Sequence, residues 1–463
     1  MAVVLKNEAA LLELFLAATQ AGMYLTPINA NLAAPEIAYI LQDSDAKAFV
    51  VSDKAADVCE KAATSIGFPE KARFTTGTIP GFRPYSELSA GQPDTLPERR
   101  SAGAAMTYTS GTTGRPKGVR RAMGDVAPEV VAQMRGMFLH LFGIPVGGDG
   151  VHLVVSPLYH TAVLSFATDH LHLGHTVVLM DKWTPEGMLE KIEKYKVTSS
   201  HMVPTQFRRL LSLPEAEKTK RDLSSLRHMI HSAAPCPVDV KQAMLAWWGP
   251  CIYEYYAASE GGGTLATPQD WLKHPGTVGN PWPISKIKVV KDDGTDCAVR
   301  EVGTVYISMG QHKFEYHKDQ KKTESSWQGE FFTVGDAGYL DEDGFLFLCD
   351  RKADMIISGG VNIYPAEIEA IINAHPDVHD VAVFGIPDED WGEQVKAVVE
   401  PNPGVTPGPD LEKSILAFCA EKLAKFKTPK SIDFTDAMPR DPNGKLYKRK
   451  LRDPFWEGKS RNI

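Results

Sequence analysis

A run of glycine, threonine and serine residues around one lysine has the clearest chemical character in this sequence. It extends from Thr109 to Lys117 and follows the apolar-leaning segment Ala102–Tyr108. Glycines let the backbone turn tightly, so that several N–H groups point at one anion, while the hydroxyls and Lys117 add donors and charge. The run therefore predicts a phosphate-binding loop rather than a plain polar surface loop. It is not a Walker loop, because Lys117 lies between Pro116 and Gly118.

Three further motifs follow in order along the chain. Tyr-Tyr-Ala-Ala-Ser-Glu ends at Glu260, Thr-Val-Gly-Asp-Ala-Gly contains Asp336, and Pro-Arg-Asp-Pro-Asn-Gly-Lys ends at Lys445. Together with the phosphate loop they resemble the adenylate-forming enzymes, which include acyl-CoA synthetases, adenylation domains of peptide synthetases and firefly-type luciferases. The resemblance covers nearly the whole chain and is strongest to bacterial fatty-acid or acid–CoA ligases. It implies that ATP activates a carboxylate as an acyl-adenylate, which is then transferred to a thiol.

The resemblance implies a role for each residue of the nucleotide site. Glu260 offers the hard oxygen that Mg²⁺ prefers, since this ion commonly takes one or two protein carboxylates plus phosphates and water. Lys445 presents a compact charge that balances the α-phosphate and carboxylate oxygens during adenylation. Asp336 and Arg351 are implied to bind the ribose. The residues implied to contact ATP or AMP are Thr109, Ser110, Gly111, Thr112, Thr113, Gly114, Lys117, Ser232, Ala233, Tyr256, Ser259, Asp336, Arg351 and Lys445.

The acyl pocket is implied by two positions. His160, in Ser-Pro-Leu-Tyr-His-Thr-Ala, matches the segment that gates the pocket, and a structural histidine is an equal alternative. Ala257 replaces the usual glycine beside the pocket, and its methyl group narrows the space. Amino-acid-activating members usually carry an aspartate near His160 for the substrate ammonium, and none occurs between Gly150 and Thr168. Acids whose organic part is uncharged are therefore favoured: fatty, aryl or steroid-side-chain acids.

The second half-reaction needs a channel for the thiol. Ser-Gly-Gly-Val-Asn-Ile-Tyr-Pro resembles the family loop that lines the pantetheine tunnel, and Gly359 and Gly360 allow the backbone to approach that slender arm closely. The hinge that exchanges this loop for Lys445 is expected at Lys352 and Ala353. Ala353 departs from the family's usual Asp or Lys.

Composition is that of a globular protein and excludes several classes. The chain has 463 residues, 43% hydrophobic and 23% charged, and its net charge of −8 offers no general attraction to nucleic acid. Its six cysteines are scattered without a metal or disulfide pattern, which fits a reducing cytosol. No membrane span or signal peptide is expected. The prediction is a cytoplasmic monomer or homo-oligomer, with peripheral membrane contact left open.

Helix-then-strand alternation predicts an α/β fold of mixed or parallel sheets flanked by helices. Expected pairs include Pro35–Leu41 before Lys47–Ser52 and Val238–Trp248 before Ile252–Tyr255, while residues 81–98 are expected to form a loop. A charged break at Asp350–Asp354 divides a large N-terminal domain, 1–350, from a small mobile α+β domain, 351–463. The resemblance also implies a few tens of residues before the part matched by Met1–Asn31.

These features predict an ATP- and Mg²⁺-dependent acid–CoA ligase whose partners are a carboxylic acid, ATP and CoA. An acyl-AMP ligase that loads a carrier protein is the nearest rival. Such members tend to carry an insertion between the domains, and none is visible between Asp336 and Gly359. The sequence is also compatible with a luciferase-type oxygenase and with a non-catalytic nucleotide- or acyl-binding homologue. The lysines and carboxylates retained at the sites above speak against a non-catalytic protein.

Overall fold

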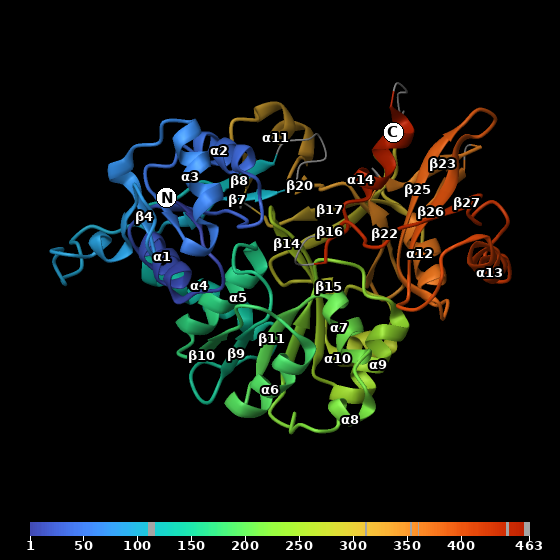
Figure 1. Ribbon diagram of the computed structural model, residues 1–463, viewed down its shortest axis with the longest axis horizontal. Coiled ribbons are helices and arrows are strands. Elements are labelled where there is room, and N and C mark those ends of the chain that lie inside the picture. The colour runs from blue at the N-terminus through green and yellow to red at the C-terminus, as the bar shows by residue number, and fades with distance from the viewer. Residues whose placement is uncertain (110–115, 311–312, 352–353, 360, 441–443, 458–463) are drawn as a thin grey trace.

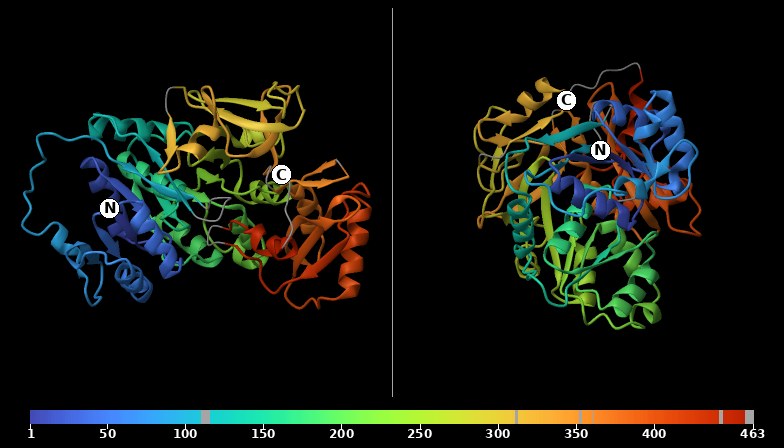
Figure 2. Two further views of the ribbon diagram at one scale, coloured as in Figure 1. Left: turned by 90° about the horizontal axis from the view of Figure 1, so that it is seen from above. Right: turned by 90° about the vertical axis from the view of Figure 1, so that its left-hand side faces the viewer.

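The chain forms an N-terminal region of several sheets and a smaller C-terminal region (Figure 1). The computed structural model describes residues 1–109, 116–310, 313–351, 354–359, 361–440 and 444–457. Within these ranges no helix is both long and apolar enough to cross a membrane. The described strands assemble into five sheets. Figure 2 shows the C-terminal region at one end of the molecule, beside the sheets of the central segment.

The first sheet is parallel and contains the N-terminus. Its order is β5-β4-β3-β1-β2-β6. The central strands β1 and β3 consist of alanine, valine and phenylalanine residues that are all buried. Apolar faces of the helices pack against it, which is what their helical periodicity predicts. Its strands are β1 (Ala2–Val4), β2 (Tyr24–Pro27), β3 (Phe49–Val51), β4 (Arg73–Thr75), β5 (Arg83–Pro84) and β6 (Ala104–Ala105). Its helical elements are α1 (Ala9–Gln20), α2 (Ala34–Asp43), η1 (Asp53–Ala55), α3 (Ala56–Ser65), η2 (Glu70–Ala72) and η3 (Tyr85–Leu88).

The second sheet has the order β10-β9-β11-β12-β13-β14-β15. Several of the predicted site residues lie on its strands or directly after them, including Ser232, Tyr256 and Glu260. Its strands are parallel from β10 to β13 and antiparallel from there on. Ligands of parallel sheets bind at the carboxyl ends of the strands. The strands are β9 (Val151–Val154), β10 (Thr176–Leu179), β11 (Ser199–Met202), β12 (His228–His231), β13 (Ile252–Ala258), β14 (Gly261–Ala266) and β15 (Asn280–Pro281). The helices are α4 (Pro128–His140), α5 (Thr161–His172), α6 (Pro185–Tyr195), α7 (Pro204–Leu211), α8 (Glu215–Lys218), α9 (Val238–Trp248) and α10 (Pro268–Lys273).

Two antiparallel sheets complete the N-terminal region. One has the order β18-β8-β7 and the other β19-β20-β17-β21-β22, with β16 paired to β17. Their elements are β7 (Thr107–Thr109), β8 (Lys117–Arg121), β16 (Lys286–Val290), β17 (Gly303–Ser308), β18 (Phe314–Tyr316), α11 (Gln320–Ser326), β19 (Trp327–Gln328), β20 (Phe331–Phe332), β21 (Asp336–Leu340) and β22 (Leu346–Arg351).

The C-terminal region is a sheet of order β24-β23-β26-β25, with β27 parallel to β26, and helices packed on it. A buried aliphatic cluster joins the sheet to α12 and α13, so this region has its own core. Its elements are β23 (Ile356–Ser358), β24 (Val361–Ile363), α12 (Pro365–Asn373), β25 (Val378–Asp388), β26 (Gly392–Pro401), α13 (Pro409–Ala420), β27 (Ser431–Phe434), α14 (Lys448–Arg452) and η5 (Asp453–Trp456).

The predicted α/β fold class is confirmed, and the predicted elements differ from the structure mainly at their ends. The helix predicted over Val238–Trp248 has these limits in the structure, whereas the strand predicted over Ile252–Tyr255 continues to Ala258. The loop predicted over residues 81–98 was partly wrong. It holds the short strand β5 and the 3₁₀ helix η3, because β5 completes the parallel sheet beside β4.

Candidate active site

The predicted phosphate loop joins two strands of a hairpin. β7 and β8 pair antiparallel, with Thr109 opposite Lys117. The Lys117 ammonium forms an ion pair with Asp319, whose carboxylate also accepts from the Lys322 N–H at the start of α11. This pairing holds the pKa of Asp319 below its usual value. Of the predicted loop residues, Ser110, Gly111, Thr112, Thr113 and Gly114 lie outside the described part of the chain.

Two tyrosines fix the base of this hairpin to α2. The Tyr108 hydroxyl donates to the Asp43 carboxylate at 2.6 Å, and the Tyr39 hydroxyl donates to the carbonyl of Pro116 at 3.2 Å. Burial and the Asp43 carboxylate raise the pKa of Tyr108, so its hydroxyl remains a donor at neutral pH. The entry and exit of the loop are therefore held by groups from a separate helix.

Glu260, the predicted Mg²⁺ ligand, is buried beside the same hairpin. The Tyr316 hydroxyl donates to its Oε1 at 2.8 Å, and Tyr316 pairs with Val119 across β18 and β8. The Arg121 guanidinium donates to the Ser259 carbonyl at 3.0 Å, which fixes the residue before Glu260. One buried carboxylate next to a phosphate loop fits Mg²⁺, which completes its shell with phosphate oxygens and water. Among the described residues, no three or more His, Cys, Asp or Glu side chains are grouped so that they could hold a metal ion by themselves.

Two of the residues predicted to contact the nucleotide, Tyr256 and Asp336, are hydrogen-bonded to each other. The Tyr256 hydroxyl donates to Asp336 Oδ2 at 2.6 Å, and Asp336 is largely buried at the start of β21. Strand register places Arg351, the other residue predicted to bind the ribose, opposite Asp336. The β13–β14 pairing shifts by one residue at Ala257 and Ala258, which re-aims the end of β13.

The turn after β12 has a strained backbone. Ala233 has a φ of +73°, a conformation that costs a residue with a Cβ about 1–2 kcal/mol. The hydroxyl of Ser232 lies 3.2 Å from His201 Nε2, and the Tyr255 hydroxyl lies 3.0 Å from the same nitrogen. Strain of this kind persists where the surroundings over-determine the backbone, and it clusters at ligand sites. Ser232 and Ala233 are among the residues predicted to contact the nucleotide, and this role remains a prediction.

Lys445 approaches from the C-terminal region. Gly444 has a φ of +80° and packs so closely on Thr205, at the start of α7, that a Cβ at this position would collide with the threonine side chain. The Arg440 guanidinium donates to the Gly444 carbonyl at 2.6 Å and to the Asp380 carboxylate. The loop that carries Lys445 is thus docked on the N-terminal region while held by its own sheet.

His160 is the predicted acyl-pocket residue that this loop reaches. Burial, then the charge of Lys445, then His201 lower the pKa of His160 to about 3, so the imidazole is neutral at physiological pH. Its Nε2 is buried and has no hydrogen-bond partner among the described residues. An unpartnered buried nitrogen beside a lysine is a suitable contact for a carboxylate substrate.

The predicted thiol loop is a hairpin of β23 and β24. The Gly359 N–H donates to the Trp391 carbonyl at 2.8 Å, and the Trp391 ring covers Gly359, whose φ is +58°. Gly360 and the predicted hinge residues Lys352 and Ala353 lie outside the described residues. Gly359 therefore contacts its own sheet in this arrangement.

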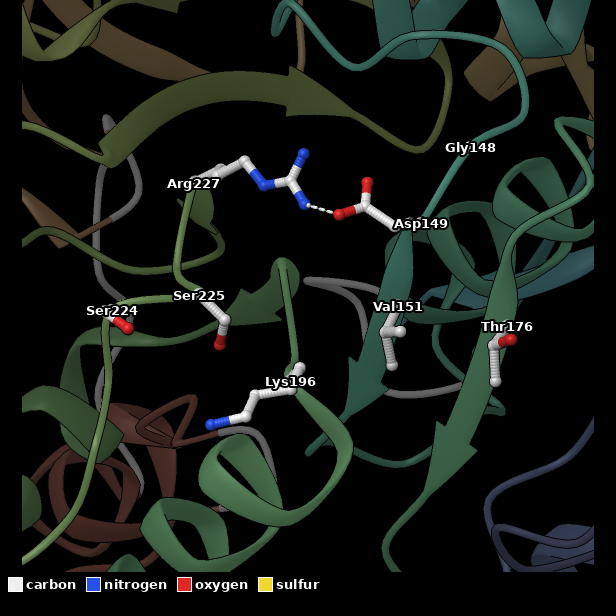
Figure 3. A pocket seen from close by; sticks show the side chains of 9 residues that line it. Gly148, Asp149, Val151, Thr176, Lys196, Ser224, Ser225 and Arg227 are labelled. Carbon is white, nitrogen blue, oxygen red and sulfur yellow. Dashed lines mark hydrogen bonds and ion pairs between the residues drawn. The ribbon is translucent and has the colours of Figure 1, made fainter.

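An open hollow of about 510 Å³ lies at the opposite edge of the second sheet (Figure 3). It is lined by the starts of β9 and β10, and Arg227 donates to Asp149 across it (Figure 3). The predicted site residues of this sheet follow the carboxyl ends of its strands. The hollow lies at the other ends of the strands and is therefore separate from the candidate site.

Sequence reasoning missed Tyr316, Asp319 and Thr205, which contact Glu260, Lys117 and Gly444 respectively. Each reaches its partner only through tertiary structure. The one indication in the sequence was the cluster of polar residues that follows Tyr316, which includes Asp319.

The α/β fold, with a large N-terminal and a small C-terminal region, is that of the adenylate-forming acid ligases, and the motifs predicted from the sequence follow in the order of that class. The chain belongs to the AMP-binding enzyme family: residues 1–314 match that family, and residues 367–445 match the AMP-binding enzyme C-terminal domain.

Relatives and solved structures agree with this assignment. The chain is 31% identical to the fatty acid–[acyl-carrier-protein] ligase ScoC of Streptomyces coeruleorubidus, over 97% of this chain and 86% of that protein. It is 30% identical to the long-chain-fatty-acid–CoA ligase FadD13 of Mycobacterium tuberculosis, over 98% and 88%. It also resembles the o-succinylbenzoate CoA synthetase of Bacillus subtilis bound to its acyl-adenylate, with a TM-score of 0.82, 27% identity and coverage of 98% and 87%.

Proposed function

We propose that this protein is an ATP- and Mg²⁺-dependent acid–CoA ligase that activates a hydrophobic carboxylate, of the fatty, aryl or steroid-side-chain type. The observation that supports it most is the docking of the loop that carries Lys445 on the start of α7 in the N-terminal region, where the charge of Lys445 helps to lower the pKa of His160. A cation whose charge reaches a neutral imidazole suits a carboxylate that is about to react, and the buried Nε2 of that imidazole has no hydrogen-bond partner among the described residues. Relatives that act on fatty acids and on o-succinylbenzoate support the same reaction class.

In the first step a substrate carboxylate oxygen attacks the α-phosphorus of ATP. A new P–O bond forms, the bond to the oxygen bridging the α- and β-phosphates breaks, and pyrophosphate leaves. Lys445 balances the charge on the oxygens of the reacting groups, and neutral His160 orients the acid. Tyr256 and Asp336 hold the adenosine. Glu260 would hold Mg²⁺, which would supply charge neutralisation at the phosphates.

In the second step the CoA sulfur attacks the acyl carbonyl carbon and AMP leaves with the electron pair of the acyl–oxygen bond. We propose that the region from residue 351 onward rotates about Lys352 and Ala353, which takes Lys445 out and brings Gly359 and Gly360 to the adenylate. β22 ends at Arg351, and the preceding Asp350 carboxylate already accepts from the Ala366 N–H of α12. This contact makes the end of β22 a suitable place for a pivot.

The test is release of pyrophosphate and AMP with a panel of fatty, aryl and steroid acids, with and without CoA. We expect pyrophosphate release that depends on the acid, and acyl-CoA only when CoA is present. A carrier-protein ligase is the second candidate, supported by the similarity to ScoC. Acyl transfer to the pantetheine arm of a carrier protein, without transfer to CoA, would favour that candidate. ATP binding with no pyrophosphate release from any acid would contradict both.

A further inference from the structure

The two faces of β13 border different surroundings. Successive side chains of a strand point to opposite faces. Tyr256 points to Asp336 on the nucleotide side, whereas Tyr255 packs on the other side against Phe142 and Phe166, with ring centroids 5.9 Å away in each case. Ala257, in the same alternation as Tyr255, packs against this aromatic cluster. This second side offers the organic part of an acid an apolar surface on the opposite side of β13 from Asp336.

The helix α5 leads from the carboxylate end into the cluster. His160 directly precedes α5, and Phe166 lies on that helix. The His201 ring lies 5.0 Å from the ring of Phe166, which is almost completely buried on α5. The path from His160 along α5 therefore meets Phe166.

The far end is closed by two more aromatic rings. Phe138, on α4, lies 5.7 Å from Phe166 and 5.1 Å from Trp282, in edge-to-face geometry. Trp282 is held by its backbone N–H, which donates to the Gly263 carbonyl at 3.0 Å. A Cβ placed on Gly263 would lie 3.0 Å from both the Ala257 methyl and the Trp282 ring. Ala257 and Trp282 therefore approach one another across a glycine that leaves no spare room.

Polar atoms at both ends of this path lack partners. His160 Nε2 and Trp282 Nε1 are buried, and neither has a hydrogen-bond partner among the described residues. Buried polar atoms are normally satisfied, so atoms left without partners indicate a missing ligand or water. One such atom marks the carboxylate end and the other the aromatic end.

We propose that Phe138, Phe166 and Trp282 form the end wall of the acyl pocket and restrict the acid to a compact one, a single aromatic ring or a short chain. This inference rests on the proposed function and narrows its substrate class, since long-chain and steroid acids need space that the three rings fill. Trp282 sets the length, because it lies against Phe138 on one side and close to Ala257 on the other and, unlike Phe166, is only partly buried.

The experiment compares wild type with Trp282→Ala by acid-dependent pyrophosphate exchange, using benzoate, 4-butylbenzoate, butanoate, hexanoate, octanoate and decanoate. We expect wild type to prefer benzoate or the shorter chains. Trp282→Ala should raise kcat/KM for octanoate and 4-butylbenzoate relative to benzoate by about tenfold or more, the size of effect that changes in a hydrophobic pocket produce. Trp247→Ala removes a partly buried indole from α9, away from the site, and should leave the ratio unchanged.

The outcomes separate this inference from the function on which it rests. Exchange with octanoate or decanoate that exceeds exchange with all compact acids, or a ratio that Trp282→Ala does not change, overturns the wall while leaving the ligase in place. Absence of exchange with every acid overturns the proposed function, and the inference falls with it. If Trp282→Ala does not fold, Trp282→Phe and Phe138→Leu are used instead, with the same shift toward longer acids expected and its absence decisive.

Discussion

The two faces of β13, the proposed nucleotide face and the proposed acyl face, are built differently. On the nucleotide face, polar side chains are already bonded to one another: Tyr256 to Asp336, Tyr316 to Glu260 and Lys117 to Asp319. On the opposite face, aromatic rings fill the space and a few buried nitrogens have no partner among the described residues. The nucleotide face is thus preorganised through bonds, whereas the acyl face is organised through shape.

This difference indicates how specificity is divided. Polar groups that are hydrogen-bonded to one another keep a fixed geometry, because moving any of them leaves a partner unsatisfied. A fixed geometry suits ATP, which is the same in every reaction cycle whichever acid is used. A wall of aromatic rings distinguishes among acids by their size. Replacing one ring by a smaller side chain changes the space that is left, at a free-energy cost that depends on the position replaced. The two faces meet where Lys445 lies near His160, so the lysine is the place to begin testing the division.

Lys445→Ala should have the largest effect. Loss of a group that stabilises developing charge typically lowers a rate by about 10²–10³-fold, and we expect this loss in pyrophosphate release. Thioester formation from supplied acyl-AMP should remain comparatively intact, because Lys445 is proposed to leave the site before the thiol arrives. Lys450→Ala, in the same basic tail, is the matched control. Equal loss of both half-reactions would contradict the exchange of Lys445 for the thiol loop.

Tyr256→Phe should have an intermediate effect confined to the nucleotide face. It removes the donor that orients the Asp336 carboxylate, a hydrogen bond to a charged group worth about 1.5–3 kcal/mol, so the KM for ATP should rise by up to about 150-fold. The preference among acids should not change, because the aromatic wall lies on the other face. Measuring kcat/KM for ATP and for two acids of different size checks both statements. Tyr253→Phe, on the same strand, serves as the control.

The sequence predicted the nucleotide face better than the acyl face. Lys117, Glu260, Asp336 and Lys445 belong to contiguous motifs whose residue types state their chemistry, and the structure brings the last three to positions consistent with it. Their roles remain predictions. The confirmed α/β class followed from helix and strand periodicity, which depends on local spacing.

The acyl face could not be derived in the same way. Phe138, Phe166 and Trp282 are far apart in the chain, and each is an ordinary apolar residue of a helix or loop when read locally. Their contact depends on how α4 and α5 pack over β13 and on the closeness that Gly263 permits. Tyr316 was missed for the same reason, since it reaches Glu260 only through the long-range pairing of β18 with β8.

The smallest expected effect is on stability. It concerns how the free energy of unfolding depends on pH through a buried histidine on the proposed acyl face. Burial lowers the pKa of His201, on the acyl side of β13, to about 4. In the unfolded chain this histidine binds a proton below about pH 6.5, whereas the folded protein resists protonation until about pH 4, so stability falls as pH decreases through this window. Between about pH 6.5 and 5.5 the loss should be about 1 kcal/mol for this group.

Urea unfolding of wild type and His201→Gln at these two pH values measures that loss. Glutamine does not titrate, so the variant should lose about 1 kcal/mol less than wild type over the same interval. His379→Gln, which replaces a half-exposed histidine of the C-terminal sheet, should follow wild type. An identical pH dependence in all three proteins would mean that His201 is protonated in the folded state as readily as in the unfolded chain. The acyl face would then be open to water, and a dry aromatic wall could not stand there.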